Sequence, residues 1–480
     1  MWRKVVADTE TPVGAALKLI EPGRGDFLLE SVEGGAVRGR YSLLGLDPDL
    51  VFRAEGDRAE VNTGWRNNRD RFEPRGMGAL QVLRDLVESC RIDLPEGLPP
   101  IACVVGYFGY ETIGLVEDLP RATGDGLGLP DMLFVRPTLI FVFDNLGEEL
   151  FAMAPLWPSV LDPAQAVDAA GERIDETLRK LAGPSPAPIH AADLPDMEPE
   201  AAMEPGQFAG MVSQAKDYIE AGDVFQVVLS QRFTCPFPLP PLALYRSLRR
   251  VNPSPFLYFL DLPGFAVVGS SPEILVRVRD GQVTIRPIAG TRPRGATPEA
   301  DREAEASLLA DAKERAEHLM LLDLGRNDVG RVAAKGTVEV TDSFTVERYS
   351  HVMHIVSNVV GALDAKHDAL DAMFAGFPAG TVSGAPKIRA CEIIAELEPA
   401  ARGPYAGGVG YFAPDGTLDS CIVLRTGVVK DGMLHVQAGA GIVADSDAAY
   451  EQRECEAKAG ALFAAAREAA RVAMEPGFGQ

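Results

Sequence analysis

Residues 309–328 read LADAKERAEHLMLLDLGRND, and this stretch decides how the rest of the sequence is interpreted. Acidic residues recur in it at helical spacing, and we expect one long helix over residues 300–322. Glu314 and Glu317 lie three positions apart, so their carboxylates project from the same face of that helix. The segment therefore presents two carboxylates side by side.

A second pair of carboxylates, Glu451 and Glu454, has the same spacing in the helix that we expect over residues 448–472. Four carboxylates on two facing helices would repel one another unless a cation lay between them, and Mg²⁺ prefers such oxygen ligands. Because the chain has 69 acidic residues, a solvated helix face explains either pair alone more simply. The two pairs together raise the hypothesis of a magnesium site.

The segments around these helices mix strands and helices irregularly. We expect an amphipathic helix over residues 208–221. Apolar runs bounded by Gly and Asp turns are typical of strands, and we expect strands at residues 27–29, 41–44, 104–108, 139–143, 224–233, 256–260, 265–268 and 274–278. Because strands and helices do not strictly alternate, the pattern favours an α+β fold with largely antiparallel sheets.

The composition changes between Gly183 and Gly206, where the sequence is rich in Pro, Ala and acidic residues. This composition is typical of a linker. A chain of 480 residues also exceeds what one hydrophobic core usually organises. We therefore divide the sequence into an N-terminal lobe at residues 1–183, a linker at 184–205 and a second lobe at 206–480.

The net charge of -23 disfavours nucleic acid and anionic membranes as partners, because most of the surface would repel polyanions. An anionic substrate would need a local concentration of positive charge. The six cysteines have no C-x-x-C spacing, which fits the reducing cytoplasm. The N-terminal sequence acquires acidic residues before any apolar run, so we expect no signal peptide, and we expect no transmembrane helix.

Several groups could supply the local positive charge. Gly-rich segments at residues 403–412 and 436–446 would let backbone N–H groups approach an anion, although glycines in strands also mark bulges. Arg425 offers a planar fork for a carboxylate, and a surface ion pair is its simpler explanation. The segment FPAGTVSGAPK at residues 377–387 lacks the G-K-[ST] ending of a phosphate loop.

His354 lies in an apolar segment, where a hydrogen-bonded core histidine is the commoner case.

Seven segments together resemble the chorismate-utilising enzyme family. They are PIAGTRPRG, ERAEHLMLLDLGRNDVGRV, HVMHIVSNV, FPAGTVSGAPKIRA, PYAGGVGYF, CIVLRT and VQAGAGIVADS, which follow one another between residues 287 and 446. The resemblance implies a layered sandwich of two largely antiparallel sheets with helices packed between them. It departs from the usual pattern at Ser420 and Phe256, where Thr and Tyr are more common, and neither change removes a charged group.

The resemblance also implies roles for individual residues. Glu317 and Glu454 are expected to be the main Mg²⁺ ligands, supported by Glu314 and Glu451. The substrate, chorismate, is expected to contact Gly290, Thr291, Tyr405, Arg425, Gly439, Ala440, Gly441 and Lys458. Catalysis is assigned to Glu273 as the general acid that protonates the departing C4 hydroxyl, to His354 beside the reacting ring, and to Thr381 as a hydrogen-bond donor to substrate.

The reaction that the resemblance implies is the addition of ammonia to chorismate followed by loss of pyruvate, which gives anthranilate for tryptophan biosynthesis. A separate glutamine amidotransferase subunit, component II, would supply the ammonia, because no Cys lies in a G-x-C-x-G elbow here. Two segments resemble a tryptophan site for feedback inhibition. They contain Glu30 and Ser31 in the first lobe and Asn252, Pro253, Ser254, Pro255, Phe256 and Leu257 in the second, and a structural turn explains either segment alone.

Two positions separate the activities within this family. Relatives that make aminodeoxychorismate typically carry Lys where this chain has Ala289, and isochorismate or salicylate synthases typically carry Lys where it has Gln226. Ammonia is nucleophilic and needs no such base, so the absence of both lysines favours direct amination. A relative that stops at the amino intermediate and a catalytically silent small-molecule sensor remain the alternatives.

Overall fold

The computed structural model describes residues 1–33, 37–122, 124, 126–157, 162–187, 191, 193–349 and 352–475. Every pairing between its strands is antiparallel, and two 12-stranded sheets contain nearly all of them. This confirms the predicted α+β class with two antiparallel sheets. Within the described residues, no helix is both long enough and apolar enough to span a bilayer.

The first sheet contains, in spatial order, β1 (Trp2–Val6), β12 (Glu149–Met153), β11 (Leu139–Asp144), β5 (Tyr41–Leu46), β2 (Asp26–Glu30), β15 (Phe256–Leu262), β16 (Phe265–Ser271), β25 (Thr426–Lys430), β26 (Met433–Ile442), β14 (Gln226–Pro236) and β13 (Glu200–Ala201), and β22 (Gly384–Ala385) also pairs with β14.

The second sheet contains β19 (Ile288–Pro293), β21 (Val352–Ala362), β18 (Gln282–Ile285), β17 (Ile274–Arg279), β24 (Leu418–Ile422), β23 (Gly408–Phe412), β9 (Val104–Phe108), β10 (Met132–Arg136), β6 (Leu50–Glu55), β7 (Arg58–Asn62) and β8 (Glu73–Gly78), and β20 (Glu339–Arg348) also pairs with β21. A separate hairpin joins β3 (Val32–Glu33) to β4 (Val37–Arg38).

The helices are α1 (Pro12–Leu19), α2 (Ala79–Glu88), α3 (Pro163–Leu181), α4 (Gln207–Glu220), α5 (Pro241–Val251), α6 (Pro298–Ala310), α7 (Ala312–Gly330), α8 (Ala369–Gly376), α9 (Gly380–Ser383), α10 (Lys387–Leu397) and α11 (Ala448–Met474), with a 3₁₀ turn η1 at Tyr110–Leu115. The helix expected at residues 300–322 is in fact two. It breaks at Asp311, whose side chain accepts hydrogen bonds from the first backbone N–H groups of α7 and so starts a new helix.

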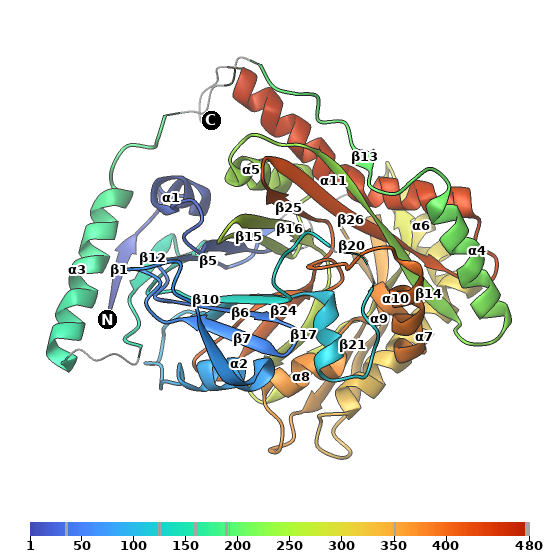
Figure 1. The fold of residues 1–480 in the computed structure, drawn as a ribbon, viewed down its shortest axis with the longest axis horizontal. Coiled ribbons are helices and arrows are strands. Elements are labelled where there is room, and N and C mark those ends of the chain that lie inside the picture. The colour runs from blue at the N-terminus through green and yellow to red at the C-terminus, as the bar shows by residue number, and fades with distance from the viewer. Residues whose placement is uncertain are drawn as a thin grey trace.

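The two sheets also contact each other directly. One apolar cluster combines residues of both sheets, and Tyr107 of β9 packs edge-on against Phe265 of β16 with ring centroids 6.1 Å apart. Helices α5 and α11 cover the first sheet and α8 contacts the second (Figure 1). Helices bridge the sheets at one end, where α9 contacts β14 and β26 and also α7, which contacts β19 and β21. Elsewhere the sheets pack directly against each other, and strands such as β9 are therefore buried on both faces.

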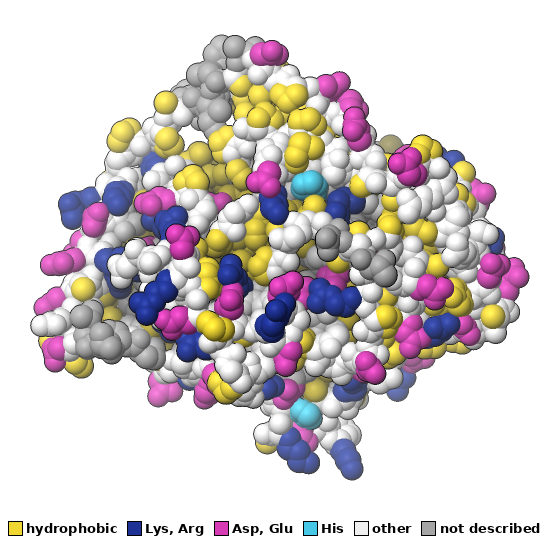
Figure 2. All heavy atoms as spheres, in the orientation of Figure 1, with side chains coloured by type: hydrophobic (Ala, Val, Ile, Leu, Met, Phe, Trp, Pro, Cys, Tyr) yellow, Lys and Arg dark blue, Asp and Glu magenta, His cyan; other side chains and the backbone are white. Residues whose placement is uncertain are grey.

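Each sheet contains strands from both sides of the segment proposed as a linker. In the first sheet β2 pairs with β15, so that Leu29 lies opposite Tyr258. In the second sheet β9 pairs with β23, so that Gly106 lies opposite Gly410. Residues 1–183 and 206–480 therefore build one pair of sheets together. On the face shown in Figure 2, acidic and basic side chains are interspersed around a central hollow that exposes hydrophobic side chains.

Candidate active site

Glu273 lies between β16 and β17, and only 6% of the residue is exposed. Burial raises the pKa of its carboxyl to about 8, because the charged form loses its hydration there. The hydroxyl of Thr381, on α9, donates to this carboxyl over 3.3 Å. Glu273 therefore carries a proton at neutral pH, which is the state that a general acid requires.

Arg425 places a cation near that carboxyl. It lies between β24 and β25 with φ at +48°, in the left-handed region. Burial lowers the pKa of its guanidinium, while Tyr349 and Glu273 raise it through space. Among the described residues Arg425 forms no ion pair, and Glu273 and Tyr349, the two groups that act on it through space, are both protonated at neutral pH. Its planar fork is available to a carboxylate ligand.

His354 lies on β21, between Thr291 of β19 and Glu347 of β20. Its Nδ1 lies 3.0 Å from the carbonyl oxygen of Gly290 and 3.1 Å from the hydroxyl of Thr291. Because a carbonyl oxygen only accepts, Nδ1 carries a proton. Burial lowers the pKa of the imidazole, so the ring is neutral near pH 7 and Nε2 can accept a proton.

Gly290 connects this histidine to the carboxylate-bearing helix α7. Its φ is +72°, and a Cβ at this position would lie 3.1 Å from Oε2 of Glu314. The backbone conformation and the close carboxylate both favour glycine here. Gly290, Thr291 and Glu314 therefore lie close to one another beside His354.

Of the predicted metal ligands, Glu317 on α7 and Glu454 on α11 lie close enough for their charges to interact. Burial raises the pKa of Glu317, and the carboxylates of Glu314 and Glu454 raise it further. Arg292 donates to Glu314 over 2.9 Å, and Lys458 pairs with Glu454 at 2.7 Å. Within the described residues, no three Asp, Glu, His or Cys side chains converge closely enough to hold a metal.

The donor set nevertheless has the chemistry of a site for a hard cation. Glu451 is 6% exposed, and its pKa is raised by burial and by the nearby Glu454. A divalent cation stabilises the charged form of carboxylates that are buried or lie close together, and oxygen ligands suit Mg²⁺. Glu317 and Glu454, on opposite helices, are the residues that such an ion would bring together.

Strand β26 forms the opposite wall of the site. A Cβ at Gly439 would lie 2.7 Å from the hydroxyl of Tyr405, and one at Gly441 would lie 2.4 Å from Nε2 of Gln226. The ammonium of Lys458 donates to the carbonyl of Gly439 over 2.9 Å. The structure therefore brings Gly439, Tyr405 and Lys458 together. Ala440 differs, because its side chain is fully buried in the apolar core and can offer only its backbone.

Two residues of the site were not predicted as site residues. Gln226 was used to distinguish activities, but its side chain also donates to Glu317 over 3.3 Å and lies against Gly441. Tyr349 packs against His354 with ring centroids 5.5 Å apart and acts electrostatically on Arg425. The sequence does not indicate that Tyr349 belongs to the site, because its contact with His354, five positions later, forms only through the hairpin of β20 and β21.

The predicted tryptophan segments meet at a cavity of about 490 Å³ between the sheets. Ser31, Pro255, Phe256 and Leu257 line it, and so do Pro272 and Ile274, on either side of Glu273, with Arg40, Arg277, Arg279 and Arg286. Glu30 also borders it, but its carboxylate accepts hydrogen bonds from Tyr245 at 2.6 Å and Arg249 at 2.8 Å.

The remaining predicted residues of that segment form the supporting turn. The carbonyl of Asn252 accepts from the Ser270 hydroxyl, and the carbonyl of Ser254 accepts from the Val32 N–H at 3.2 Å. With Pro253 between them, these residues hold Pro255–Leu257 against the cavity. We refer to this space as the regulatory cavity.

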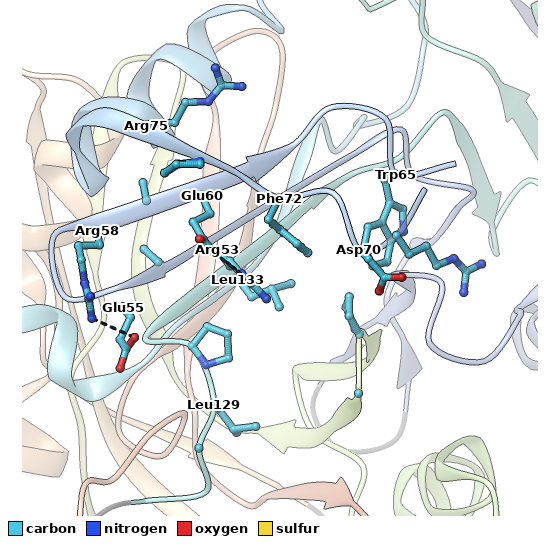
Figure 3. Close-up of a pocket in the computed structure, with 18 of the residues that line it drawn as sticks. Arg53, Glu55, Arg58, Glu60, Trp65, Asp70, Phe72, Arg75, Leu129 and Leu133 are labelled. Atoms are coloured by element: carbon cyan, nitrogen blue, oxygen red, sulfur yellow. Dashed lines mark hydrogen bonds and ion pairs between the residues drawn. The ribbon is translucent and has the colours of Figure 1, made fainter. Parts of the chain in front are cut away.

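A larger cavity, of about 1080 Å³, lies elsewhere, beside β6, β7 and β8 (Figure 3). Two ion pairs line it, Arg58 with Glu55 at 3.2 Å and Arg53 with Glu60 at 2.6 Å. Trp65 and Phe72 add aromatic surface. None of the predicted catalytic or substrate-binding residues lines it, so size alone does not identify the active site.

Comparisons with known proteins identify the family of this chain. The family model described as chorismate binding enzyme matches residues 30–464. The chain is 53% identical over 482 residues to anthranilate synthase component 1 of Cereibacter sphaeroides, covering 100% of this chain and 96% of that protein. Identity to the Thermus thermophilus protein of the same name is 47% over 471 residues, covering 97% of each.

A solved structure, that of anthranilate synthase component I from Streptococcus pneumoniae, superposes with a TM-score of 0.79 at 36% identity, covering 88% of this chain and 92% of that one. The fold is that of a chorismate-binding enzyme, and the chain belongs to that family. Within the family it groups with the proteins named anthranilate synthase component 1, to which it is 43% to 53% identical.

Proposed function

We propose that this chain is the aminating subunit of an anthranilate synthase, a cytoplasmic enzyme that converts chorismate and ammonia to anthranilate and pyruvate. The buried, protonated Glu273 beside the cation of Arg425 carries the proposal, because the pair suits an anionic substrate that must lose a hydroxyl group. The six cysteines are free and buried, which agrees with a reducing compartment.

Different side chains serve different steps of the proposed reaction. Arg425 and the β26 backbone at Gly439 and Gly441 hold the carboxylates of chorismate. Glu273 gives its proton to the C4 oxygen, which leaves as water while ammonia bonds to C2. His354, neutral with a free Nε2, is placed to accept a proton as the ring becomes aromatic and pyruvate departs.

Glu317 and Glu454 would hold Mg²⁺, supported by Glu314 and Glu451, and the bound ion would supply positive charge for a substrate carboxylate. Lys458 and Arg292 now pair with two of these carboxylates. We infer that the Lys458 and Arg292 side chains change their contacts when Mg²⁺ and the substrate bind.

The positions of Gln226 and Ala289 support amination over hydration. Gln226 lies against Gly441 and Glu317 within the site, and Ala289 is buried beside Gly290. Neither offers an amine that could attack the ring or activate water. An assay with chorismate, ammonium and Mg²⁺ tests the proposal, since anthranilate is fluorescent. A non-aromatic amine as the end product would favour the alternative aminating enzyme, and no turnover would favour a sensor.

We further propose that ammonia comes from a separate glutaminase subunit. All six thiols are buried, so none is exposed as a glutaminase nucleophile would be. The purified chain should form anthranilate with concentrated ammonium salts but not with glutamine. Glutamine-dependent turnover by the highly purified chain alone would contradict this proposal.

Feedback inhibition by L-tryptophan is proposed for the regulatory cavity. An indole suits the apolar surface of Phe256 and Pro255, and the cavity also contacts Pro272 and Ile274, which flank Glu273. A ligand there can therefore shift the general acid. The carboxylate of Glu30 would have to share its existing partners, Tyr245 and Arg249, with the ligand's ammonium group.

Replacing Ser31 by Phe should abolish this inhibition. The larger side chain would fill the cavity that Ser31 lines, and the catalytic carboxylates on α7 and α11 would be untouched. We expect Ser31→Phe to keep at least about half of the uninhibited rate and to lose tryptophan sensitivity, because a filled pocket cannot bind its ligand. Initial rates with and without tryptophan provide the measurement. Equal inhibition of variant and parent would refute the assignment.

A further inference from the structure

A chain of polar contacts connects the regulatory cavity to the active site. Arg286 lines the cavity and forms an ion pair with Glu347. The other oxygen of the Glu347 carboxylate accepts a hydrogen bond from the Tyr349 hydroxyl at 3.1 Å. The Tyr349 ring in turn packs against the imidazole of His354. Three consecutive contacts therefore lead from a cavity arginine to a catalytic histidine.

Glu347 also acts on the histidine directly. In the ladder of β20 and β21, Glu347 lies opposite His354. Paired residues in antiparallel strands lie within about 5.5 Å at their Cα atoms, so a displacement of one is felt by the other. The carboxylate favours the charged form of the His354 imidazole, and Tyr349 acts on Arg425. The position of Glu347 thus influences the His354 imidazole directly and the Arg425 guanidinium through Tyr349.

The other arginines that line the cavity have different partners. Arg40 pairs with Asp144 at 2.9 Å. Arg277 and Arg279 both pair with Asp419, at 3.1 and 3.4 Å. Among these four arginines, Arg286 is the one whose carboxylate partner also contacts a residue packed against His354. This difference distinguishes one contact chain from its neighbours.

An amino-acid ligand would bring its own carboxylate into the cavity. A guanidinium binds carboxylates through a planar fork of donors, so the ligand and Glu347 would compete for Arg286. Once drawn toward the ligand, Arg286 would loosen its hold on Glu347. The carboxylate would then move relative to Tyr349 and the opposite His354.

We propose that Glu347 is a positioning residue through which ligand binding in the regulatory cavity changes the placement of Tyr349 and His354. This inference rests on the proposed regulation by tryptophan and specifies its route. By linkage, tryptophan and chorismate must then weaken each other's binding by the same factor, which in such systems is about 5- to 150-fold.

The test measures that factor directly. Tryptophan binding is titrated by calorimetry on the full chain, with and without saturating chorismate and without ammonia, so that no amination occurs. The coupling factor is the ratio of the two dissociation constants. In Glu347→Gln we expect it to fall to within about twofold of unity, while tryptophan affinity without chorismate stays within about threefold of the parent, since any cooperative coupling needs a differential contact.

The matched control is Asp419→Asn, which makes the same carboxylate-to-amide change at a partner of two other cavity arginines. Its coupling factor should equal that of the parent, whatever its tryptophan affinity. If Glu347→Gln does not fold, as judged by circular dichroism, Glu347→Asp keeps the charge but withdraws it by one methylene and should also lower the factor.

Parent-like coupling in the Glu347 variant would overturn the inference, and so would an equal loss in Asp419→Asn. A loss of tryptophan binding without any chorismate present would overturn it too, because Glu347 would then serve the ligand site itself. A parent chain that binds no tryptophan would instead refute the proposed regulation, which keeps the two failures distinct.

Discussion

Replacing Glu273 by Gln should lower kcat by about 10²- to 10⁴-fold, the usual contribution of a general acid, and leave chorismate binding nearly unchanged. The amide keeps the size of the side chain and can still accept the Thr381 hydrogen bond, but it has no proton to give to the C4 oxygen. Stopped-flow binding and steady-state rates measure the two quantities separately. A variant with parent-like kcat would exclude Glu273 as the acid.

The pH dependence offers an independent check on the same residue. The pKa of the Glu273 carboxyl is raised to about 8, so the acid form is present below that pH and is lost above it. In the parent, kcat/KM should therefore fall about tenfold per pH unit above pH 8, because this parameter reports the free enzyme. This fall should be absent from the residual activity of Glu273→Gln.

Replacing Glu317 or Glu454 by Gln should reduce turnover on the order of 10³-fold, equivalent to several kcal/mol of lost charge stabilisation. Each change removes one carboxylate from the pair of facing helices and weakens the binding of Mg²⁺. The dependence of the rate on Mg²⁺ concentration and the rise in melting temperature that Mg²⁺ causes should both diminish.

Glu456→Gln is the matched control, because Glu456 lies on the same helix, is exposed and contacts Gln452 rather than the site. It should keep the parent's rate and its response to Mg²⁺. Near-normal rates at limiting Mg²⁺ in both Glu317→Gln and Glu454→Gln would mean that these glutamates merely solvate a helix face.

The two carboxylate pairs could be predicted from sequence because their spacing is local. Glu314 with Glu317, and Glu451 with Glu454, need only a helix to share a face. The break at Asp311 was missed because the helical spacing of acidic residues continues through it, although an Asp before a helix is a common N-cap. Local spacing thus predicted which residues share a helix face better than it predicted where one helix ends and the next begins.

The element that covers each face of a buried strand could not be predicted in the same way. The residues of β11 are buried on both faces, which shows that a layer covers each side but not whether that layer is a helix or a sheet. Tyr349 was missed for a related reason: its contact with His354 depends on the register of a hairpin. The resemblance to the family supplied the roles of Glu273 and Arg425, whose proximity no local pattern predicts.

The sharing of both sheets by the two halves of the sequence has a consequence for synthesis on the ribosome. Strand β9 cannot pair with β23 until β23 has been synthesised, and the paired residues Phe108 and Gly408 are 300 positions apart. At about 5–20 residues per second, translation takes about 15–60 s to cover that interval. During this time the apolar β9 has no partner on that edge, and unpaired edges promote aggregation. We therefore expect the nascent chain to depend on chaperones until its last strands emerge.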